Sequence, residues 1–528
     1  MLSVISPDEM KKLDQLAINQ GKIPGLLLME NAAMAVTSLV QSLLSEELQL
    51  SSDQSRVCIF SGIGNNGGDG LAAARQLVVQ GYQVELVLVG DTEKLSGDAL
   101  INWEIVRHRD DIMIHTIKRG DSKELSLIEE ILRTSDIIMD ALLGTGLSGA
   151  PREPINTCIK LINQSKNELS RVVSVDIPSG VFGDTGQVVG NAVVADHTIT
   201  FAWPKIGLLL YPGANYIGTL VSAPIGIPHW LTSEIKSNNY LVTDRRVAEL
   251  LPERSICSHK GDFGRVTVVA GSRKMLGAGI LTANSAMKTG SGLVTLAVPD
   301  SEEQTAQSKL KPEIMSWGLD SKNGVFAPTA GKELMDENHN NLDVMAIGPG
   351  ISVNEGTEDV VESVVTNVNC PLVIDADALN ILSNKKELLE NHGQLRILTP
   401  HIGEFSRLTG YSIEKVQEIS LELVKEFALK WNSIIVLKGA PTIIGTPDQF
   451  AYIVFTGNSG MASGGMGDVL TGIITSLIGQ GLTIEEAAIV GVYLHKTVGE
   501  KARDDLGEMV MTAEDIWRYL PKAIEYIS

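Results

Sequence analysis

Short runs of Val, Ile and Leu that alternate with amphipathic stretches are the feature that most limits how this chain can fold. The runs lie at 56–61, 83–90, 136–143, 171–176, 197–202 and 218–223, and again at 265–270, 293–298, 344–347, 372–375, 396–398 and 434–437. A strand that is apolar along its whole length must be buried on both faces. The alternation therefore predicts an α/β protein whose parallel sheets are covered by helices on both sides, in three layers.

The chain is long enough for several domains, and one polar stretch interrupts the pattern. Its 528 residues correspond to two to four domains at about 100 to 200 residues each. Periodicity is lost at 233–239 (Ser-Glu-Ile-Lys-Ser-Asn-Asn), and the strand pattern restarts afterwards. We expect a first domain at 1–227, a linker at 228–239 and a second domain at 240–528. The first should open with a helix through about Asn19, because Ser6-Pro7-Asp8-Glu9 is a capping box.

Composition and charge disfavour several classes of partner. Lys and Arg number 43 against 64 Asp and Glu, a net charge of −21, so a nucleic-acid backbone would meet an unfavourable field. No stretch of 18 apolar residues occurs, and charged residues stand where a signal peptide needs an apolar core, so we expect a cytoplasmic protein with no membrane partner. The cysteines lack a Cys-x-x-Cys pair, which favours free, buried thiols at Cys58, Cys158, Cys257 and Cys370.

A glycine-rich loop follows the first predicted strand. Gly62-Ile-Gly-Asn-Asn-Gly-Gly-Asp-Gly70 lies between that strand and a helix expected from Leu71. Glycines let the backbone approach an anion closely, and the helix start presents free N–H groups, so the loop predicts a phosphate site. The spacing Gly62-x-Gly64-x-x-Gly67, with Asp91 after the next strand, also fits a nicotinamide dehydrogenase. A tight turn selected for packing alone is the plain alternative.

Polar residues also follow two other strands of the first half. Asp140 precedes a second glycine loop at 144–150, and Asp176 precedes Ser179. Ligands of open α/β sheets bind beyond the carboxyl ends of the strands, where these residues are expected to meet the first loop. Asn66, Asp140 and Ser179 are hard oxygen ligands with one formal charge between them, which suits a weakly charged cation better than bare Mg²⁺.

In the second half the strongest motif is Gly457-Asn-Ser-Gly-Met-Ala-Ser-Gly-Gly-Met-Gly-Asp468, followed by an apolar helix. Small residues leave the N–H groups of Gly465, Met466 and Gly467 free to stabilise a transferring phosphoryl group. Asp468 can accept the proton of an attacking hydroxyl. A Gly-x-x-x-x-Gly-Lys-[Ser/Thr] loop is missing, as are His-Glu-x-x-His and Gly-x-Ser-x-Gly, which excludes a P-loop NTPase and two common hydrolases.

The first half resembles the NAD(P)HX epimerase domain, a Rossmann-like fold. The likeness rests on Gly64-Asn-Asn-Gly-Gly-Asp-Gly70, Asp140-Ala-Leu-Leu-Gly-Thr-Gly146, Asp176-Ile-Pro-Ser-Gly180 and Phe201-Ala-Trp-Pro-Lys205. It implies that K⁺ is bound by Asn66, Asp140 and Ser179. It also implies that the hydrated dinucleotide is contacted by Asn65, Asn66, Gly67, Gly68, Asp69, Gly144, Thr145, Gly146, Leu147, Ser148, Gly149, Ala150 and Asp176.

Epimerising the hydrated carbon requires proton transfer at one centre, either to open the hemiaminal reversibly or to remove its hydroxyl. We expect Asp176 to carry this proton. Lys205 is a second catalytic candidate, through charge stabilisation. A lysine that follows proline on a loop can equally be a solvated surface residue, and the sequence leaves both alternatives open.

The second half resembles the ribokinase-like kinases and, more specifically, the NAD(P)HX dehydratase domain. The Gly-x-Gly-Asp motif ends at Asp468, and Thr399-Pro-His-Ile-Gly-Glu404 matches a Thr-Pro-Asn-x-x-Glu segment except that His401 replaces asparagine. Lys260-Gly-Asp-Phe-Gly-Arg265 and Gly348-Pro-Gly350 support the dehydratase. The resemblance implies Mg²⁺ with ADP or ATP, and Glu404 as an outer metal ligand. It implies hydrate contacts by Ala278, Gly350, His401 and Asp468, and nucleotide contacts by Lys438, Gly439, Ala440, Pro441, Thr442, Gly465, Met466 and Gly467.

Together the two halves predict a repair enzyme that epimerises R- and S-NADHX and NADPHX and dehydrates the S form. Its partners would be hydrated NADH and NADPH and a nucleotide, and by analogy the chain would form a homo-oligomer. Two other interpretations remain: a vitamin or sugar kinase fused to a noncatalytic dinucleotide-binding module, and an NAD-dependent dehydrogenase. Backbone N–H groups bind diphosphates and triphosphates alike, so the choice between ADP and ATP also stays open.

Overall fold

Two compact units make up the chain in this computed structural model. One unit is Ser3–Ser237, and the other is Asn238–Ser528 together with Met1–Leu2. The structure describes residues 1–118, 122–235, 237–338, 342–390, 393, 396–455 and 457–528. The segment expected as a linker contains helix α8 (His229–Thr232) and the first residue of strand β9 (Asn239–Leu241), and Lys236 lies outside the described residues.

The first unit is built on a seven-stranded sheet in the order β4-β3-β2-β5-β6-β7-β8, and every pair is parallel. The strands are β2 (Arg56–Ser61), β3 (Gln83–Val89), β4 (Met113–Ile117), β5 (Ile137–Ala141), β6 (Arg171–Val175), β7 (His197–Phe201) and β8 (Thr219–Ala223). The predicted parallel sheet is confirmed. Edge strand β4 was not predicted, because only its last residue is buried and its sequence carries no apolar run.

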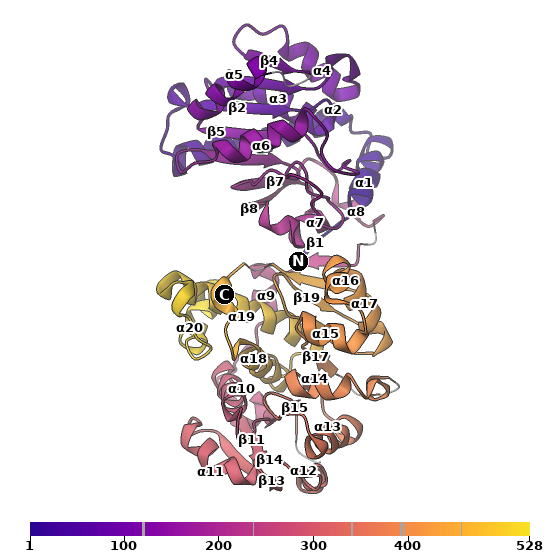
Figure 1. Cartoon of the computed structure of the whole chain (residues 1–528), viewed down its shortest axis with the longest axis vertical. Helices are drawn as coiled ribbons and strands as arrows, with labels where there is room; N and C mark the ends of the chain where they lie inside the picture. Colours follow the sequence, from indigo (N-terminus) through magenta and orange to yellow (C-terminus); the bar gives the residue numbers. More distant parts are fainter. Residues whose placement is uncertain (119–121, 236, 339–341, 391–392, 394–395, 456) are drawn as a thin grey trace. The chain divides into compact units, whose positions relative to one another are not determined.

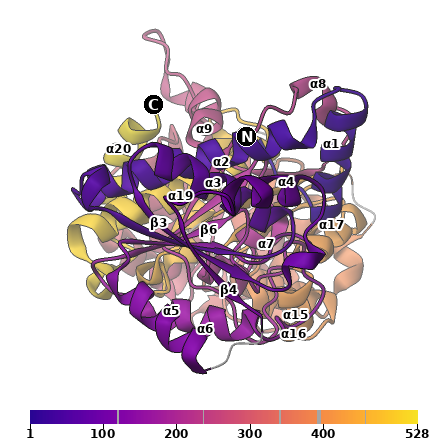
Figure 2. The same ribbon diagram turned by 90° about the horizontal axis from the view of Figure 1, so that it is seen from above.

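Helices cover both faces of this sheet (Figures 1 and 2). They are α1 (Pro7–Asn19), α2 (Gly25–Ser42), α3 (Asn65–Val79), α4 (Gly97–Val106), α5 (Ser122–Thr134), α6 (Ile155–Ser165) and the short α7 (Ile206–Leu209). Helices α1 to α4 share one apolar cluster with Ile59 and Leu86, whereas α5 and α6 share another with Phe60 and Val87. Since neighbouring strand residues point to opposite faces, these clusters are the two cores of a three-layer fold.

The capping box and two of the thiols agree with expectation. The Ser6 hydroxyl accepts the Glu9 N–H at 3.2 Å, and the Glu9 carboxylate accepts the Ser6 N–H at 2.7 Å. Cys58 and Cys158 are buried, but Cys257 is exposed and Cys370 is only partly buried, so the prediction of a buried thiol is wrong at Cys257 and holds only in part at Cys370. Cys257 stands in the irregular segment between α9 (Asp244–Leu250) and β10 (Arg265–Val269).

One segment, Gly25–Glu47, is long and apolar enough to cross a membrane by length and composition. It contains α2, whose residues Leu28, Val36 and Val40 belong to the core of the first unit. The core helix of a soluble protein passes the same test, and this packing accounts for its apolar character.

The second unit contains an eleven-stranded sheet in the order β1-β9-β20-β19-β18-β17-β16-β15-β10-β11-β12. The pairs from β18 through β12 are parallel, while β19 is antiparallel to both of its neighbours. The strands are β1 (Leu2–Ser3), β10 (Arg265–Val269), β11 (Leu293–Pro299), β12 (Met315–Leu319), β15 (Val344–Ile347), β16 (Leu372–Ile374), β17 (Arg396–Leu398), β18 (Ile434–Leu437), β19 (Thr442–Gly445) and β20 (Ala451–Val454), with β9 as above. The antiparallel extension β19–β20 was not predicted.

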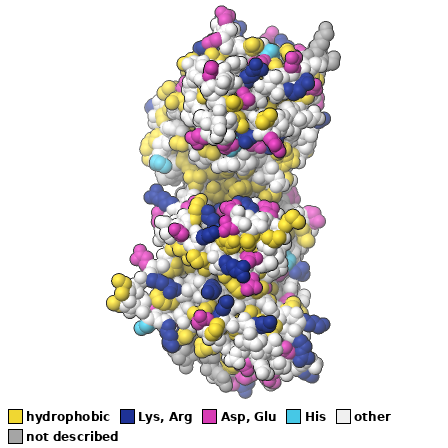
Figure 3. Space-filling view, turned by 90° about the vertical axis from the view of Figure 1, so that its left-hand side faces the viewer, with side chains coloured by type: hydrophobic (Ala, Val, Ile, Leu, Met, Phe, Trp, Pro, Cys, Tyr) yellow, Lys and Arg dark blue, Asp and Glu magenta, His cyan; other side chains and the backbone are white. Residues whose placement is uncertain are grey.

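Helices cover this sheet as well (Figure 1). They are α9 (Asp244–Leu250), α10 (Leu276–Thr289), α11 (Asp300–Lys309), α12 (Ala330–Asn338), α13 (Glu355–Asn367), α14 (Ala376–Leu382), α15 (Ile402–Thr409), α16 (Ile413–Glu418), α17 (Ser420–Lys430), α18 (Met466–Gly479), α19 (Ile484–Leu506) and α20 (Ile516–Ile527), beside the hairpin β13 (Ser321–Lys322) and β14 (Val325–Phe326). On the surface shown in Figure 3, basic and acidic side chains are intermingled.

Helices α10 and α18 pack with almost no space between their backbones. A Cβ at Gly472 would lie 2.3 Å from the Thr282 carbonyl oxygen, which only glycine avoids. The Ser285 hydroxyl donates to the Val469 carbonyl at 2.8 Å. The two helices are therefore locked side by side along their length.

Candidate functional site

The first glycine loop is shorter than predicted, because α3 begins at Asn65 and not at Leu71. A Cβ at Gly67 would lie 1.9 Å from the Gly62 carbonyl oxygen, so the glycines let the helix start directly after the strand. Gly67, Gly68 and Asp69 are buried in the first turns of α3, whereas Asn65 is exposed. Of the predicted contact residues in this string, Asn65 is therefore the one most open to a ligand.

The predicted cation ligands lie together at the carboxyl edge of the first sheet. The Asn66 amide donates to the Leu143 carbonyl at 2.8 Å, and the Ser179 hydroxyl donates to Asp140 Oδ1 at 2.6 Å. Ser179 also accepts the Leu143 N–H at 2.8 Å, so Leu143 links the two contacts. Among the described residues, the buried Asn66 Oδ1 has no hydrogen-bond donor. Burial raises the pKa of Asp140, against the hydrogen bonds from Ser179 and Ser174.

The second glycine loop reaches the same place. A Cβ at Gly144 would lie 3.1 Å from Asn66 Cβ, so the loop begins beside the cation ligands. Gly146, Ser148 and Ala150 are exposed, and Thr145, Leu147 and Gly149 are half-buried. The structure thus brings the start of the predicted substrate loop next to the start of α3.

Asp176 and Lys205 form a buried ion pair. Asp176 Oδ1 accepts from Lys205 Nζ at 2.6 Å, and also from the Thr200 hydroxyl and the Phe201 N–H. Lys205 has no exposed side-chain surface, and its ammonium donates further to Thr200 and to the Phe201 carbonyl. The surface interpretation of Lys205 is therefore wrong, since the side chain points inward and all three of its protons are used.

The backbone of Asp176 is in the left-handed region, with φ of 63°. Such a conformation costs about 1–3 kcal/mol outside glycine and persists where the surroundings demand it. Here the ion pair to Lys205 and the Asp176 N–H bond to the Ile199 carbonyl hold the residue in place. The side chain is thereby aimed at its neighbours in the site.

Two further carboxyl groups surround this pair. Burial raises the pKa of Asp69 well above its ordinary range, and Asp176 and Asp14 raise it further, against Lys205. Burial likewise raises the pKa of Asp14, on α1, to about 6, with Lys205 opposing and Asp176 adding to the shift. Asp69 therefore holds its proton more strongly than an ordinary carboxyl group does, and it lies within electrostatic reach of Asp176 and Lys205.

In the second unit, α18 begins at Met466 with Gly465 as its N-cap at φ of 92°. The predicted anion hole is thus the first turn of a long helix, and Asp468 lies in that turn. Burial raises the pKa of Asp468 to about 7; Asp375 adds to the shift and Lys438 opposes it. A carboxyl group with this pKa is divided between acid and base near neutral pH, as a general base requires.

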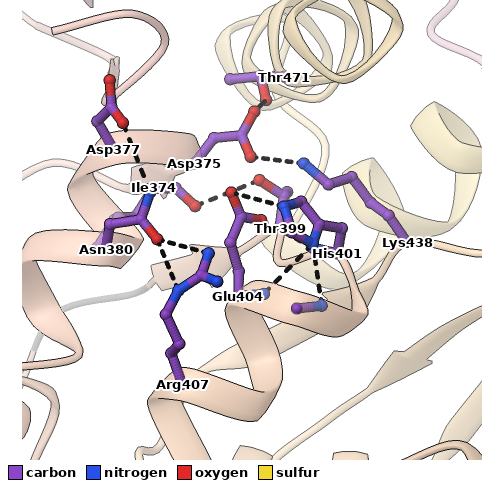
Figure 4. A network of polar contacts seen from close by, with 11 residues as sticks. Ile374, Asp375, Asp377, Asn380, Thr399, His401, Glu404, Arg407, Lys438 and Thr471 are labelled. Atoms are coloured by element: carbon purple, nitrogen blue, oxygen red, sulfur yellow. Dashed lines mark hydrogen bonds and ion pairs between the residues drawn. The ribbon is translucent and has the colours of Figure 1, made fainter. Parts of the chain in front are cut away.

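Beneath this turn lies a polar network from four elements (Figure 4). Asp375 follows β16 and is 1% exposed. It accepts from Lys438 Nζ at 2.7 Å and from the Thr471 hydroxyl of α18 at 2.7 Å. Lys438 was expected to contact the adenine nucleotide; its ammonium points under the helix start, where a Cβ at Gly467 would lie 3.2 Å away.

His401 is the N-cap of α15, so the same side chain caps this helix and belongs to the predicted site. Its Nδ1 accepts the N–H groups of Gly403 at 3.0 Å and Glu404 at 3.3 Å, while the side chain stays half-exposed. Burial lowers the pKa of His401, and Lys438 and Arg407 lower it further, which favours the uncharged imidazole. Burial raises the pKa of Glu404 to about 7.

The remaining predicted residues of the second site fall on two sides of the network. Ala278 lies in the first turn of α10, and a Cβ at Gly350 would lie 3.0 Å from Ala278 Cβ, so these two are neighbours. Gly439 and Ala440 are exposed, and Pro441 and Thr442 are buried. The Thr442 hydroxyl closes that turn by donating to the Gly439 carbonyl at 2.9 Å.

Sequence reasoning missed two acidic residues that the structure brings to these sites. Asp14 faces the Asp176–Lys205 pair from α1, and nothing in the local sequence separates it from a solvent-facing helix residue. Asp375 ends the predicted run 372–375 and directly follows β16, in the position where Asp176 follows β6. That position at a carboxyl strand end was the signal that could have found it.

Two α/β units, each with its charged groups at the carboxyl edge of its own sheet, define a two-site α/β enzyme. Family models agree with this division: one described as NAD(P)H-hydrate dehydratase matches residues 266–522, and one described as YjeF-related protein N-terminus matches residues 25–207.

Full-length relatives carry both parts. The bifunctional NAD(P)H-hydrate repair enzyme of Moorella thermoacetica is 40% identical over 520 residues, which is 98% of this chain and 96% of that protein. The enzyme of the same name from Thermofilum pendens is 38% identical over 526 residues, covering 99% and 96%. The chain belongs to the family of bifunctional NAD(P)H-hydrate repair enzymes. Because the chain belongs to this family, the two other interpretations, an NAD-dependent dehydrogenase and a vitamin or sugar kinase, are excluded.

A solved structure is similar to part of the chain. The ADP/ATP-dependent NAD(P)H-hydrate dehydratase from Bacillus subtilis, co-crystallised with ATP and Mg²⁺, is 30% identical with a TM-score of 0.48, and covers 55% of this chain and 99% of that one. The expected fold class, a Rossmann-like domain followed by a ribokinase-like domain, is confirmed.

Replacing Gly465 by alanine tests the helix start. Alanine in the left-handed region costs about 1–2 kcal/mol. Its Cβ would also lie 2.6 Å from Leu281 Cδ1 and 3.0 Å from Ala513 Cβ. We expect Gly465→Ala to lower the melting temperature of the second unit and to weaken nucleotide binding.

Gly464→Ala is the matched control, because its Cβ would meet nothing within 4 Å and its φ is not positive. Differential scanning calorimetry and nucleotide titration of both variants make the comparison. Equal behaviour of the two alanine variants would show that the left-handed N-cap is not needed.

Proposed function

We propose that this chain repairs hydrated NADH and NADPH in the cytoplasm by two activities. The first domain, residues 1–227, interconverts the R and S hydrates. The second, residues 240–528, dehydrates the S form with ADP or ATP, releasing AMP or ADP and phosphate. The observation that carries the proposal is the pairing of a buried proton-carrying cluster in one unit with a base at an anion-binding helix start in the other. An enzyme that dehydrated only one epimer would leave the other unrepaired.

Epimerisation would use Asp176 as the proton carrier. Oxygen Oδ1 is engaged by Lys205, so the other carboxylate oxygen is the one available for the substrate. Asp69, a buried carboxyl group whose pKa is raised by burial, would donate a proton to the hydroxyl while Asp176 stays paired with Lys205. Because the Lys205 ammonium has no free proton, it would act by positioning Asp176 and not on the substrate itself.

The residues around Leu143 fit a potassium ion. Asn66 Oδ1 is buried and has no donor among the described residues, and Asp140 and Ser179 supply further oxygens beside it. These are hard ligands with a single formal charge, which matches a large monovalent cation better than a divalent one. The ion would anchor the start of α3 and the loop at 144–150, which carry the predicted substrate contacts.

In the second site the hydrate would lie between α10 and α15, contacting Ala278, Gly350 and His401. The imidazole of His401 uses Nδ1 to cap its helix, and its half-exposed Nε2, which lies 3.4 Å from Glu404 Oε1, would turn to the substrate. The nucleotide would lie over the turn from Lys438 to Thr442, with its phosphates at Gly465, Met466 and Gly467. Mg²⁺, bound with the nucleotide, would neutralise phosphate charge, and the buried Glu404 is an outer ligand in this proposal.

Asp468 would start the reaction by removing the proton of the hydrate's hydroxyl. The hydroxyl oxygen then bonds to the terminal phosphorus of the nucleotide, and the bond from that phosphorus to the bridging oxygen breaks, leaving its electron pair on the nucleotide. Phosphate is a far better leaving group than hydroxide. The ring nitrogen's lone pair expels it, and loss of a proton from the adjacent ring carbon restores the reduced nicotinamide.

Absorbance of reduced nicotinamide provides the test of the whole proposal. Purified protein is added to a mixture of R- and S-NADHX with Mg²⁺ and K⁺, in the presence of ADP, ATP or no nucleotide. We expect complete conversion with at least one nucleotide, which also identifies the donor. Conversion that stops near half, under conditions where spontaneous epimerisation is slow, would contradict the epimerase assignment, and no conversion would contradict the function.

Two substitutions should separate the activities. Asp468→Asn removes the base of the second site and should abolish dehydration while sparing epimerisation. Asp176→Ala should do the reverse, because the proton carrier of the first site is lost. Epimerisation is followed by resolving the two hydrates chromatographically, and dehydration by starting from pure S-NADHX. Loss of both activities in either variant would argue against two independent sites.

The rate of dehydration should depend on the ionisation of Asp468. Burial, with Asp375, raises its pKa to about 7. The base acts when ionised, so kcat/KM should rise with pH up to about 7 and level off above it. One unit below the pKa only about a tenth of the groups are ionised, which predicts roughly tenfold slower dehydration. A profile that is flat, or that falls with rising pH between 6 and about 8, would exclude Asp468 as the base.

A further inference from the structure

Asp375 occupies a fixed position at the carboxyl edge of the second sheet. Its N–H donates to the Ile347 carbonyl at 3.1 Å, and its own carbonyl lies so close to Gly348 that a Cβ there would be 1.9 Å away. The side chain is 1% exposed. A buried carboxylate is tolerated only where charged or polar partners compensate for the lost water.

Both carboxylate oxygens of Asp375 have such partners, and they come from different elements. Oδ1 accepts from Lys438, which follows β18, and Oδ2 accepts from Thr471, in the second turn of α18. Asp375 therefore ties the end of β18 to the helix that starts with the anion hole. Figure 4 shows the carboxylate between these two side chains.

Lys438 is placed by this contact directly beneath the first turn of α18. Its Nζ would lie 3.2 Å from a Cβ at Gly467, and Asp375 Oδ2 would lie 4.0 Å from the same point. An ammonium group has three donors, and among the described residues the side chain of Asp375 is the one acceptor bonded to it. Two donors thus remain for a ligand at the helix start.

Asp468 lies within the electrostatic reach of the same pair. Lys438 lowers its pKa and Asp375 raises it, so the two charges act on the base in opposite directions. In the described part of the chain no side chain hydrogen-bonds the Asp468 carboxylate. The base is thereby left free for a substrate hydroxyl, while Lys438 beneath it supplies a positive charge.

We propose that Asp375 is a positioning residue of the second site, which holds the Lys438 ammonium under Gly467 so that its two remaining N–H groups contact the transferring phosphoryl group. This inference rests on the proposed phosphoryl transfer. As the bond from the hydrate's oxygen to phosphorus forms and the bond to the nucleotide's bridging oxygen breaks, negative charge spreads over the phosphoryl oxygens. Lys438 donates to those oxygens, and Asp375 with Thr471 fixes where it stands.

A purely structural role for Asp375 makes a different prediction. If the carboxylate served only to neutralise a buried lysine, its loss would reduce folding stability and leave the turnover of folded molecules unchanged. If it positions Lys438, turnover at saturating nucleotide falls in folded protein. The two roles are therefore separated by kcat in variants whose folded fraction is known.

A double-mutant cycle on the full chain provides the test. Dehydration of pure S-NADHX at saturating nucleotide and Mg²⁺ is measured for Asp375→Asn, Lys438→Met and the double variant. Removing one donor to a developing oxyanion costs about 10²- to 10³-fold in kcat, and Lys438→Met should fall in this range. Asp375→Asn should lose a comparable factor, with the nucleotide KM changed by less than about threefold.

The double variant decides the question. If Asp375 acts through Lys438, the kcat of the double variant should match that of Lys438→Met within about threefold, because the effects of residues that act as a unit are not additive. Multiplicative losses in the double variant would overturn the proposal. A wild-type enzyme that does not dehydrate at all would instead refute the proposed function on which the inference rests.

Thr471 provides a second test that spares the buried charges. Thr471→Val removes the hydroxyl that donates to Asp375 and should lower kcat by about tenfold, whereas Thr471→Ser keeps the donor and should stay within about twofold. If Asp375→Asn does not fold, the comparison of Thr471→Val with Thr471→Ser still tests the proposal. Equal kcat values for these two variants would contradict it.

Glu302→Gln is the control for loss of a buried carboxylate away from the network. Glu302, on α11, is 8% exposed and pairs with Arg273 at 2.9 Å. The kcat of Glu302→Gln should equal that of the wild type. For every variant, the folded fraction is measured by thermal unfolding and by the epimerase activity.

Discussion

A lysine ammonium removed from water costs several kcal/mol unless a well-placed carboxylate meets it. Each unit of this protein contains one such pair at the carboxyl edge of its sheet: Lys205 with Asp176 at 2.6 Å, and Lys438 with Asp375 at 2.7 Å. In each pair the aspartate directly follows one parallel strand and the lysine follows another. The position of the charges is therefore decided by strand order, and the glycine loops and helix starts are arranged around them.

The two pairs use their lysines differently, although the geometry is alike. The ammonium of Lys205 donates to three protein oxygens and has no exposed surface, so it holds Asp176, the proposed proton carrier, in place. Lys438 has one protein partner among the described residues and lies next to the start of α18, where we propose that the phosphates bind. In the proposed function, the first unit would therefore present a carboxyl group to its substrate, while the second would present a cation.

Most of the architecture could be predicted from the sequence, because buried parallel strands leave continuous apolar runs. All the predicted strands of the first sheet formed, and the capping box at Ser6 marked the first helix correctly. The edge strand β4 and the antiparallel pair β19–β20 were not predicted, because a half-exposed strand and a hairpin extension do not give a continuous apolar run that marks a parallel strand.

The candidate site was predictable where strand order alone brings residues together. Asn66, Asp140 and Ser179 lie together as expected because they stand at or just after the carboxyl ends of neighbouring strands of one parallel sheet. The start of α3 was misplaced because its glycines were taken for a loop, when they allow a helix to begin against the Gly62 backbone. The burial of Lys205 and the approach of Asp14 depend on how distant segments pack, which composition and spacing do not encode.

The contact at Gly472 bears on how the second site can move. Helix α10 carries Ala278, on the side proposed for the hydrate, and α18 carries the turn proposed for the phosphates. Because their backbones are in contact at Gly472, these helices form one rigid block. The distance between the proposed hydrate site and the proposed phosphate site is therefore set by helix packing and not by a loop. A single methyl group at position 472 would force these two helices apart, and would thereby change the spacing between the side proposed for the hydrate and the turn proposed for the phosphates.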